Sequence, residues 1–210
     1  MTDTQYDPAH TGLLLVDPYN DFLSEGGKVW PLVEEVAKEV GLLDNLRAVV
    51  AAARAAGIQV FVVPHRRGRE GNYANWNYLT RDQAAAKEAL VFEDGAWGGD
   101  WHPDFVPQPN DVVIHEHWAQ SGFANTDLDF QLKKHGITHV VNVGMLANSC
   151  IESTSRFAME LGYHVTLVRG ATAAFSRELL HAAHELNGPT YAHAILSTDE
   201  LVTAFKGAHV

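Results

Sequence analysis

Three polar residues of this 210-residue chain each follow a short apolar run, and their types suit nucleophilic catalysis. Asp17 ends GLLLVD, His115 ends DVVIH, and Cys150, the only cysteine, follows VVNVG after a tight turn. A thiolate nucleophile works with a carboxylate that takes the thiol proton and with a cation or donor that stabilises negative charge. We assign these roles to Cys150, Asp17 and His115, although an aspartate after a strand also commonly caps a turn or pairs with an arginine.

The residues around Cys150 predict a reactive thiol. Ser149 and Glu152 have the spacing of a capping box, which predicts that Ser149 is a helix N-cap and that Cys150 lies in the first turn. Free amide N–H groups and the positive end of the helix dipole favour the thiolate there. The alternative is that Cys150 is a small buried hydrophobic residue.

Six short apolar runs predict the strands that position these residues. Each run is apolar at consecutive positions, which is typical of strands covered by helices on both faces. We predict one domain over residues 1–210, with an α/β, three-layer α/β/α, Rossmann-like fold and a mainly parallel six-stranded sheet in the order 3-2-1-4-5-6. The expected strands are 13–16, 60–63, 112–114, 140–143, 165–168 and 194–196, and the expected helices lie near 32–56, 125–135, 150–161 and 176–187. Ligands bind beyond the carboxyl ends of such strands, so Asp17, His115 and Cys150 are expected on one edge.

Residues 64–111 are rich in Gly, Pro, Asn and Trp, which predicts a loop-rich excursion over the active-site edge. Aromatic residues in or beside these loops predict a small aromatic-lined pocket, although each on its own is more often part of the packing. Arg66, Arg67 and Arg69 could bind a substrate carboxylate, or could form a solvated basic loop. The candidate substrate-binding residues are Phe22, His65, Trp76, Trp97, His117, Trp118 and Phe123.

Twelve histidines raise the question of a metal site. The segment HEHW places His115 and His117 on one face if it is extended, but no third ligand with a familiar spacing accompanies them. His65 in VVPH could be a ligand, could contact substrate, or could be a structural histidine. We therefore predict no metal and no cofactor.

The composition limits the classes of function. A net charge of -11 and a pI near 5.4 argue against nucleic acid or an anionic membrane as the main partner, because such binding requires a basic surface. The polar, acidic start MTDTQYDPAH does not resemble a signal peptide, and no apolar run approaches the length of a membrane span. We expect a cytoplasmic protein, and a single cysteine suits a reducing compartment.

The sequence resembles the isochorismatase-like cysteine hydrolases, which include nicotinamidases and N-carbamoylsarcosine amidohydrolases. The resemblance rests on LLLVDPYNDF (13–22) and on the long ordered block from Ser121 to Phe175. It implies that Asp17 is the general base and acid, that Cys150 is the nucleophile, and that the Met145–Leu146 peptide bond is cis. It further implies that the backbone N–H groups of Leu146 and Cys150 form the oxyanion hole, and that the protein is a homo-oligomer, commonly a dimer or tetramer.

One departure from the family matters for the chemistry. The family has a catalytic lysine at the end of the third strand, where this chain has DVVIHEHWAQSGF. We expect His115 to replace it, with His117 as the alternative, and the Asp-x-His pattern of metal-containing nicotinamidases is absent from VVPHRRGRE. The expected function is hydrolysis of a small amide or carbamoyl C–N bond through a Cys150 thioester. The alternatives are a catalytically silent protein that binds a small ligand, and an isochorismatase-type vinyl-ether hydrolase.

Overall fold

The computed structural model describes residues 6–207 and contains a six-stranded sheet in the order β3-β2-β1-β4-β5-β6. All neighbouring strands are parallel. The predicted fold class and strand order are therefore confirmed. The strands are β1 (Thr11–Val16), β2 (Gln59–Val63), β3 (Val112–Val113), β4 (His139–Met145), β5 (His164–Ala173) and β6 (Ala194–Ser197).

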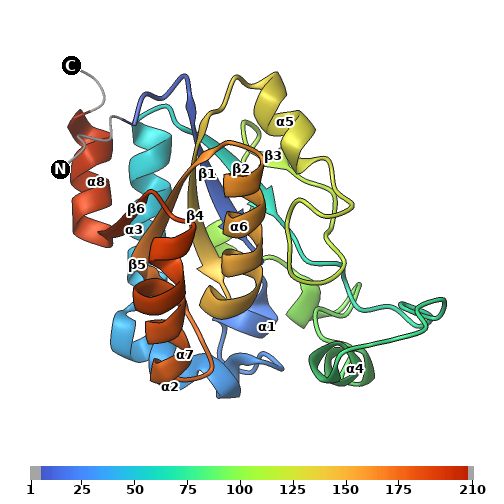
Figure 1. The fold of residues 1–210 in the computed structure, drawn as a ribbon. Coiled ribbons are helices and arrows are strands. Elements are labelled where there is room, and N and C mark those ends of the chain that lie inside the picture. The colour runs from blue at the N-terminus through green and yellow to red at the C-terminus, as the bar shows by residue number, and fades with distance from the viewer. Residues whose placement is uncertain (1–5, 208–210) are drawn as a thin grey trace.

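Helices cover both faces of the sheet, because successive residues of each strand point to opposite faces. Leu13 and Leu15 of β1 belong to a core cluster that includes residues of α2, α3 and α8. Leu14 and Val16 belong to a second cluster, which includes residues of α5 and α6. Figure 1 shows α3 and α8 on one side of the sheet and α5 and α6 on the other. The helices are α1 (Asn20–Leu23), α2 (Trp30–Val40), α3 (Leu42–Ala55), α4 (Arg81–Glu88), α5 (Leu128–Lys134), α6 (Glu152–Glu160), α7 (Arg177–His181) and α8 (Thr198–Gly207).

The helices differ from the prediction at several places, of which two concern the packed layers around the sheet. The helix expected over 32–56 is two helices, because Gly41 adopts a φ of 66° that ends α2 and redirects the chain into α3. The last helix, α8, has no counterpart in the prediction, although it buries Leu201 and Phe205. It directly follows the short strand β6, and its start is marked by a capping box between Ser197 and Glu200 that the prediction overlooked.

The long connection between β2 and β3 contains α4 and two single 3₁₀ turns, Trp97–Gly99 and Pro103–Phe105. No residue of α4 is buried, and Figure 1 shows this helix standing apart from the sheet. The later part of the connection is tied to the turn after β1 by Asp21. The buried carboxylate of Asp21 accepts hydrogen bonds from the backbone N–H groups of Lys28 and Phe92. This segment is therefore fixed next to the carboxyl end of β1.

Within residues 6–207, every helix is too short or too polar to cross a lipid bilayer.

Candidate active site

Asp17 is the first residue after β1, and its side chain is fully buried. Its N–H donates to the Val63 carbonyl at 3.0 Å and its carbonyl accepts from the Tyr19 N–H at 2.8 Å. The φ of Asp17 is 53°, a left-handed conformation that aspartate adopts more readily than most residues but that still costs on the order of 1–3 kcal/mol. The turn after β1 therefore holds this carboxylate in a defined orientation.

His117, rather than His115, lies against Asp17. His117 Nε2 is 3.0 Å from Asp17 Oδ1, and both side chains are fully buried. An ionised carboxylate can only accept, so we assign the Nε2–H as the donor. The side chain of His115 is 81% exposed, and its Nδ1 is 3.7 Å from Asp127 Oδ1. The expected placement of His115 beside Asp17 is wrong, and His117 occupies that position.

The reason for this difference is one extra residue in the segment after β3. Val113 pairs with Val62, whereas His117, and not Glu116, pairs with His65. An inserted residue of this kind is a β-bulge, and it changes which side chains face a given side of the sheet. The His117 N–H donates to the Pro64 carbonyl at 2.9 Å, which fixes the segment after the bulge.

Cys150 lies in a π-helical turn, Ala147–Ile151, between β4 and α6. It is 6% exposed and belongs to the same core cluster as Val16 and Val63. Its Sγ, a carboxylate oxygen of Asp17 and a ring nitrogen of His117 all lie within 4.8 Å of one another. The sulfur is also 3.8 Å from the carbonyl oxygen of Ala119, to which the thiol can donate. The carboxylate of Asp17 is thus the acidic group beside the thiol, and a small approach of the two side chains would let the proton move between them.

The predicted capping box is wrong. Leu146 precedes the π-helical turn, and no side chain in the described part of the chain caps that turn. Glu152 begins α6, and its carboxylate pairs with Arg156, at 2.8 Å, instead of reaching back to Ser149. Ser149 is inside the turn, with its hydroxyl 3.9 Å from Cys150 Sγ. The chain therefore enters α6 through a widened turn, and Cys150 does not occupy an open helix N-terminus.

The environment of Cys150 favours the protonated thiol, contrary to the expectation from the sequence. Burial raises the pKa of Cys150 well above its ordinary value, and the negative charge of Asp17 raises it further. Hydrogen bonds from Ser149 and from the Leu146 backbone act in the opposite direction but are smaller effects. The thiol therefore keeps its proton until a nearby base removes it.

Gly144 allows β4 to approach β1 beside the site. Its φ is 112°, and a Cβ at this position would lie 2.1 Å from the Val16 carbonyl oxygen. A side chain cannot be accommodated there unless one of the two strands moves. The next peptide bond but one, Met145–Leu146, is cis, as expected from the family. Val16 directly precedes Asp17, so this contact sets the distance between the end of β1 and the turn that carries Cys150.

Two buried polar atoms of the site have no hydrogen-bond partner among residues 6–207: Asp17 Oδ2 and His117 Nδ1. A buried polar atom without a partner costs free energy, so such atoms are typical of sites that act on another molecule. Asp17 Oδ2 keeps its lone pairs free to take a proton.

An aromatic cluster, formed by Tyr73, Trp76 and Trp118, lies next to Cys150. The ring centroids are 5.2 Å apart for Tyr73 and Trp76 and 6.2 Å apart for Trp76 and Trp118. The Tyr73 hydroxyl donates to the Trp118 carbonyl. Trp118 immediately precedes Ala119, whose carbonyl oxygen is next to the thiol. Two predicted substrate-binding residues, Trp76 and Trp118, are therefore brought together, and Trp118 is one residue from the carbonyl next to the thiol.

The other predicted substrate-binding residues lie in different surroundings. Phe22 is buried against Phe92 in the core cluster that does not include Cys150. Trp97 is half exposed, and its carbonyl accepts from Asn20. Phe123 shares a core cluster with Cys150 and stacks on Phe157. The structure thus places Phe22 and Phe123 in the packing rather than on an open surface.

His65 contacts the site through His117. The two rings are 5.0 Å apart in an edge-to-face arrangement, and His65 Nδ1–H donates to the carbonyl of Arg66. Burial lowers the pKa of His65, and His117 lowers it further. A neutral His65 can pack against His117 without adding a positive charge to the site.

The three arginines after β2 have different partners. Arg67 pairs with Glu116 at 2.7 Å, and Arg69 pairs with Asp94 at 2.9 Å. The guanidinium of Arg66 lies 4.1 Å from the centroid of the Trp118 ring, and its Nη1 forms a long ion pair of 3.7 Å with Glu116 Oε2. Its Nε is buried and has no partner within residues 6–207. Of these three arginines, Arg66 is the one with a buried guanidinium nitrogen that has no partner in the described part of the chain.

The sequence interpretation missed Tyr73 as a member of this site. Tyr73 has a φ of 62° and lies in a Gly- and Asn-rich loop, which gave no periodic pattern. Burial raises its pKa; Arg66 lowers it and Cys150 raises it, which places Tyr73 within electrostatic reach of both residues. The left-handed backbone conformation of Tyr73, and with it the position of its ring, is seen only in the folded loop.

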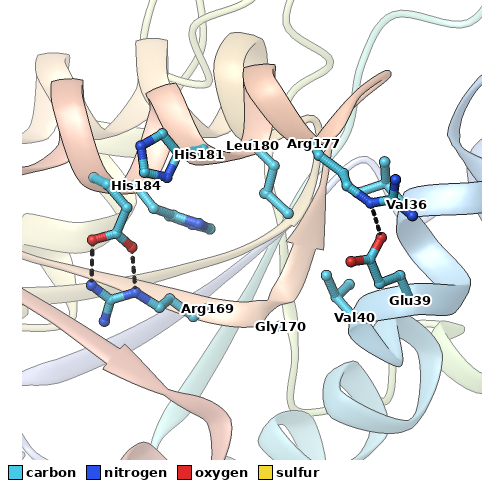
Figure 2. A pocket seen from close by; sticks show the side chains of 10 residues that line it. Val36, Glu39, Val40, Arg169, Gly170, Arg177, Leu180, His181 and His184 are labelled. Carbon is cyan, nitrogen blue, oxygen red and sulfur yellow. Dashed lines mark hydrogen bonds and ion pairs between the residues drawn. The ribbon is translucent and has the colours of Figure 1, made fainter.

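A cavity of about 300 Å³ between α2, β5 and α7 is separate from these residues. Figure 2 shows Arg169 paired with a carboxylate at one end and Arg177 paired with Glu39 at the other. The first carboxylate is Glu185, which forms two hydrogen bonds with Arg169. Both arginines are already neutralised, and none of Asp17, His117 and Cys150 lines the cavity.

Comparisons with known proteins agree with this geometry. The family model of the isochorismatase domain matches residues 11–200. Ureidoacrylate amidohydrolases from Pantoea ananatis and Variovorax paradoxus are each 30% identical to this chain, over 89% and 94% of it and over 78% and 82% of their own lengths.

Solved structures show the same fold. A cysteine hydrolase from Pseudomonas syringae pv. phaseolicola superposes with a TM-score of 0.76 at 24% identity, covering 98% of this chain and 96% of the other. An N-carbamoylsarcosine amidase from Thermoplasma acidophilum has a TM-score of 0.65 at 25% identity, covering 90% and 97%. With a family model that matches nearly its whole length, the chain belongs to the isochorismatase-like cysteine hydrolase superfamily and is an enzyme of the hydrolase class.

Proposed function

We propose that this enzyme hydrolyses a small amide or carbamoyl C–N bond, with Cys150 as nucleophile, Asp17 as general base and acid, and His117 in the position of the family lysine. The observation that carries the proposal is the mutual distance of at most 4.8 Å between the sulfur, the carboxylate and the imidazole. Amidohydrolases at 30% identity support the choice of bond. Covalent catalysis requires a nucleophile and a base within reach of one another.

The first half of the reaction forms a thioester. Asp17 Oδ2 takes the proton of Cys150 as the sulfur attacks the carbonyl carbon, and the N–H groups of Leu146 and Cys150 hold the resulting oxyanion. The C–N bond then breaks, and Asp17 returns the proton to the departing nitrogen. His117 Nε2–H, bonded to Asp17 Oδ1, leaves Oδ2 as the oxygen that exchanges the proton.

The second half releases the acid. Water gives a proton to Asp17 as its oxygen attacks the thioester, and the proton passes to the sulfur when the C–S bond breaks. The raised pKa of Cys150 suits this cycle, because the thiol is the stable form at the start and at the end. A carbamoyl substrate follows the same steps and yields a carbamate.

Arg66 supports a substrate that carries a carboxylate. Its guanidinium lies over Trp118, one residue from the carbonyl next to the thiol, and its buried Nε has no partner within residues 6–207. A planar guanidinium binds a carboxylate with two parallel hydrogen bonds. Small ureido acids are therefore the first compounds to test.

The test is a panel of small amides, ureas and ureido acids, assayed for release of ammonia or amine. We expect turnover by the wild type and a loss of at least about 10³-fold in Cys150→Ala. The matched control is Cys150→Ser, which keeps the size of the side chain and replaces the thiol by a weaker nucleophile. Mass spectrometry of the wild type mixed with a slow substrate is expected to show an acyl adduct on Cys150.

Full activity in Cys150→Ala, with its fold verified by circular dichroism, would exclude the covalent route. If compounds of the panel bind but none of them is turned over, the protein is a catalytically silent binding protein. Cleavage of a vinyl ether without a sulfur adduct would identify isochorismatase-type chemistry.

The assembly and the cellular location also stay proposals. We propose a homo-oligomer, supported by the exposed apolar side chains of Phe130 on α5, of Phe157 on α6 and of Leu161 directly after α6. Light scattering of the purified protein measures the mass directly, and a monomer contradicts the proposal. The acidic composition and single cysteine support a cytoplasmic location.

A further inference from the structure

The replacement of a lysine by a histidine gives this site a set of atoms that a metal ion can use. Asp17, His117 and Cys150 supply oxygen, nitrogen and sulfur within 4.8 Å of one another, and all three residues are buried. A protonated lysine has no lone pair and repels a cation, whereas a neutral imidazole is among the commonest metal ligands. The property therefore follows from this chain's own departure from the family.

The distances suit one tetrahedral ion. With Zn–S near 2.3 Å and Zn–N and Zn–O near 2.0–2.1 Å, the ligand atoms of a zinc site lie about 3.3–3.6 Å apart. The distance between His117 Nε2 and Asp17 Oδ1 is 3.0 Å, and the widest separation in the cluster is below 4.8 Å. Small side-chain rotations are sufficient to place all three atoms around one ion.

The types of the donors and a free lone pair point to zinc rather than to magnesium or calcium. Thiolate and imidazole ligands favour zinc, while magnesium and calcium prefer sets of oxygen atoms. Asp17 Oδ2 is buried without a partner among residues 6–207, so one carboxylate oxygen is available without the loss of a hydrogen bond. His117 Nε2 exchanges its hydrogen bond to Asp17 for the metal.

We propose that Asp17, His117 and Cys150 together bind one Zn²⁺ ion and that the bound ion blocks the hydrolase reaction. On binding, Cys150 releases its proton to the solvent as the Zn–S bond forms, and a water molecule fills the fourth position. The nucleophile and the base then both serve as ligands. The block rests on the proposed function, whereas the binding of zinc does not.

The test measures zinc binding by titration calorimetry on tag-free protein that has been dialysed against a chelator. We expect one ion per wild-type chain at this site. The affinity for zinc should be at least about 100-fold lower in His117→Gln and in Cys150→Ser, because removing a residue that binds the metal directly reduces the affinity more than removing a residue that only supports a ligand. His115→Gln is the matched control, since His115 is exposed two residues away and should leave the affinity unchanged.

Cobalt gives a second readout that needs no turnover. Co²⁺ added to the wild type is expected to produce a thiolate-to-cobalt charge-transfer band, which disappears in Cys150→Ser. Zinc should also slow the alkylation of Cys150 in the wild type but not in His117→Gln. Equal zinc affinity in the wild type, His117→Gln and Cys150→Ser, or a cobalt complex without the band, overturns the proposal.

The proposed block of the hydrolase reaction by zinc is tested separately from the binding of zinc. If the amide panel identifies a substrate, zinc at the concentration that saturates the site is expected to suppress turnover, and a chelator should restore it. Zinc binding at the cluster with undiminished turnover overturns the block. Zinc binding with no substrate in the panel identifies a failure of the proposed function alone.

Discussion

A carboxylate next to a buried thiol has two opposite effects on the sulfur. Asp17 raises the pKa of Cys150 by its negative charge and so makes the resting thiol less reactive, but it is also the base that activates this thiol during the reaction. Removal of the negative charge of Asp17 is thus predicted to lower enzymatic turnover but to make the resting Cys150 thiol more reactive.

Asp17→Asn tests this separation. We expect turnover to fall by about 10²–10⁴-fold, because the base is lost. The rate of alkylation of Cys150 should meanwhile reach its midpoint at a lower pH than in the wild type, because the pKa of the thiol falls when the charge is removed. The shift is measured by iodoacetamide kinetics of the wild type and the variant as a function of pH. An alkylation midpoint that rises in Asp17→Asn contradicts the electrostatic explanation.

Asp17 and Cys150 could be predicted from the sequence because each follows a buried apolar strand of a parallel sheet. The residue that replaces the family lysine could be narrowed to two histidines, but His115, the one preferred from the sequence, is not the one that lies against Asp17. The bulge that brings His117 opposite His65 depends on pairing with β2, and no local residue pattern in HEHW encodes it. The environment of the thiol was also predicted incorrectly. The spacing of Ser149 and Glu152 is that of a capped α-helix, but in the structure Ser149 lies within a π-helical turn.

At the level of the elements, the approach of β4 to β1 controls the geometry of the site. The sequence predicts these strands well because both are central in the sheet, where helices cover both faces and the residues are apolar at nearly every position. It does not predict α4, which buries nothing and forms through its own capping box, Thr80 with Gln83. Elements that depend on local signals alone are the hardest to distinguish from loops.

Gly144→Ala is expected to disturb both stability and activity. The new Cβ would lie 2.1 Å from the Val16 carbonyl oxygen, so β1 and β4 must separate next to Asp17. We expect the free energy of unfolding to fall by about 1–3 kcal/mol. We also expect kcat to decrease by a larger factor than that by which KM changes. Urea denaturation and steady-state kinetics give the two values. Gly57→Ala is the control, because that glycine also has a positive φ, 71°, but a Cβ there meets nothing within 4 Å.

At the level of the whole molecule, three histidines link the amino-terminal ends of the last strands. The rings of His139 and His164 are 4.7 Å apart, and those of His164 and His193 are 4.8 Å apart. Burial lowers the pKa of His164 to about 4, and the neighbouring histidines contribute. The unfolded chain, in which histidine titrates near 6.5, binds a proton more readily than the folded protein.

The stability of the protein is therefore predicted to decrease in mild acid. The contribution of His164 is complete above about pH 6.5 and is lost as the pH falls towards 4, because only the unfolded state gains the proton in this range. After allowance for partial exposure, we expect about 1–2 kcal/mol. His164→Gln should reduce the difference in Tm between pH 7.5 and 5, whereas His115→Gln should leave it as in the wild type. An identical pH dependence in His164→Gln contradicts this assignment.

Asp17 and His117 are 100 positions apart in the chain, yet they meet because β2 lies between β1, which precedes Asp17, and β3, which precedes His117. Contacts of such high sequence separation form late, after much of the loop-closure entropy has been spent. No fragment that ends before β4 contains a complete set of reacting groups. Recovery of enzymatic activity during refolding therefore reports completion of the central sheet, rather than the appearance of helices.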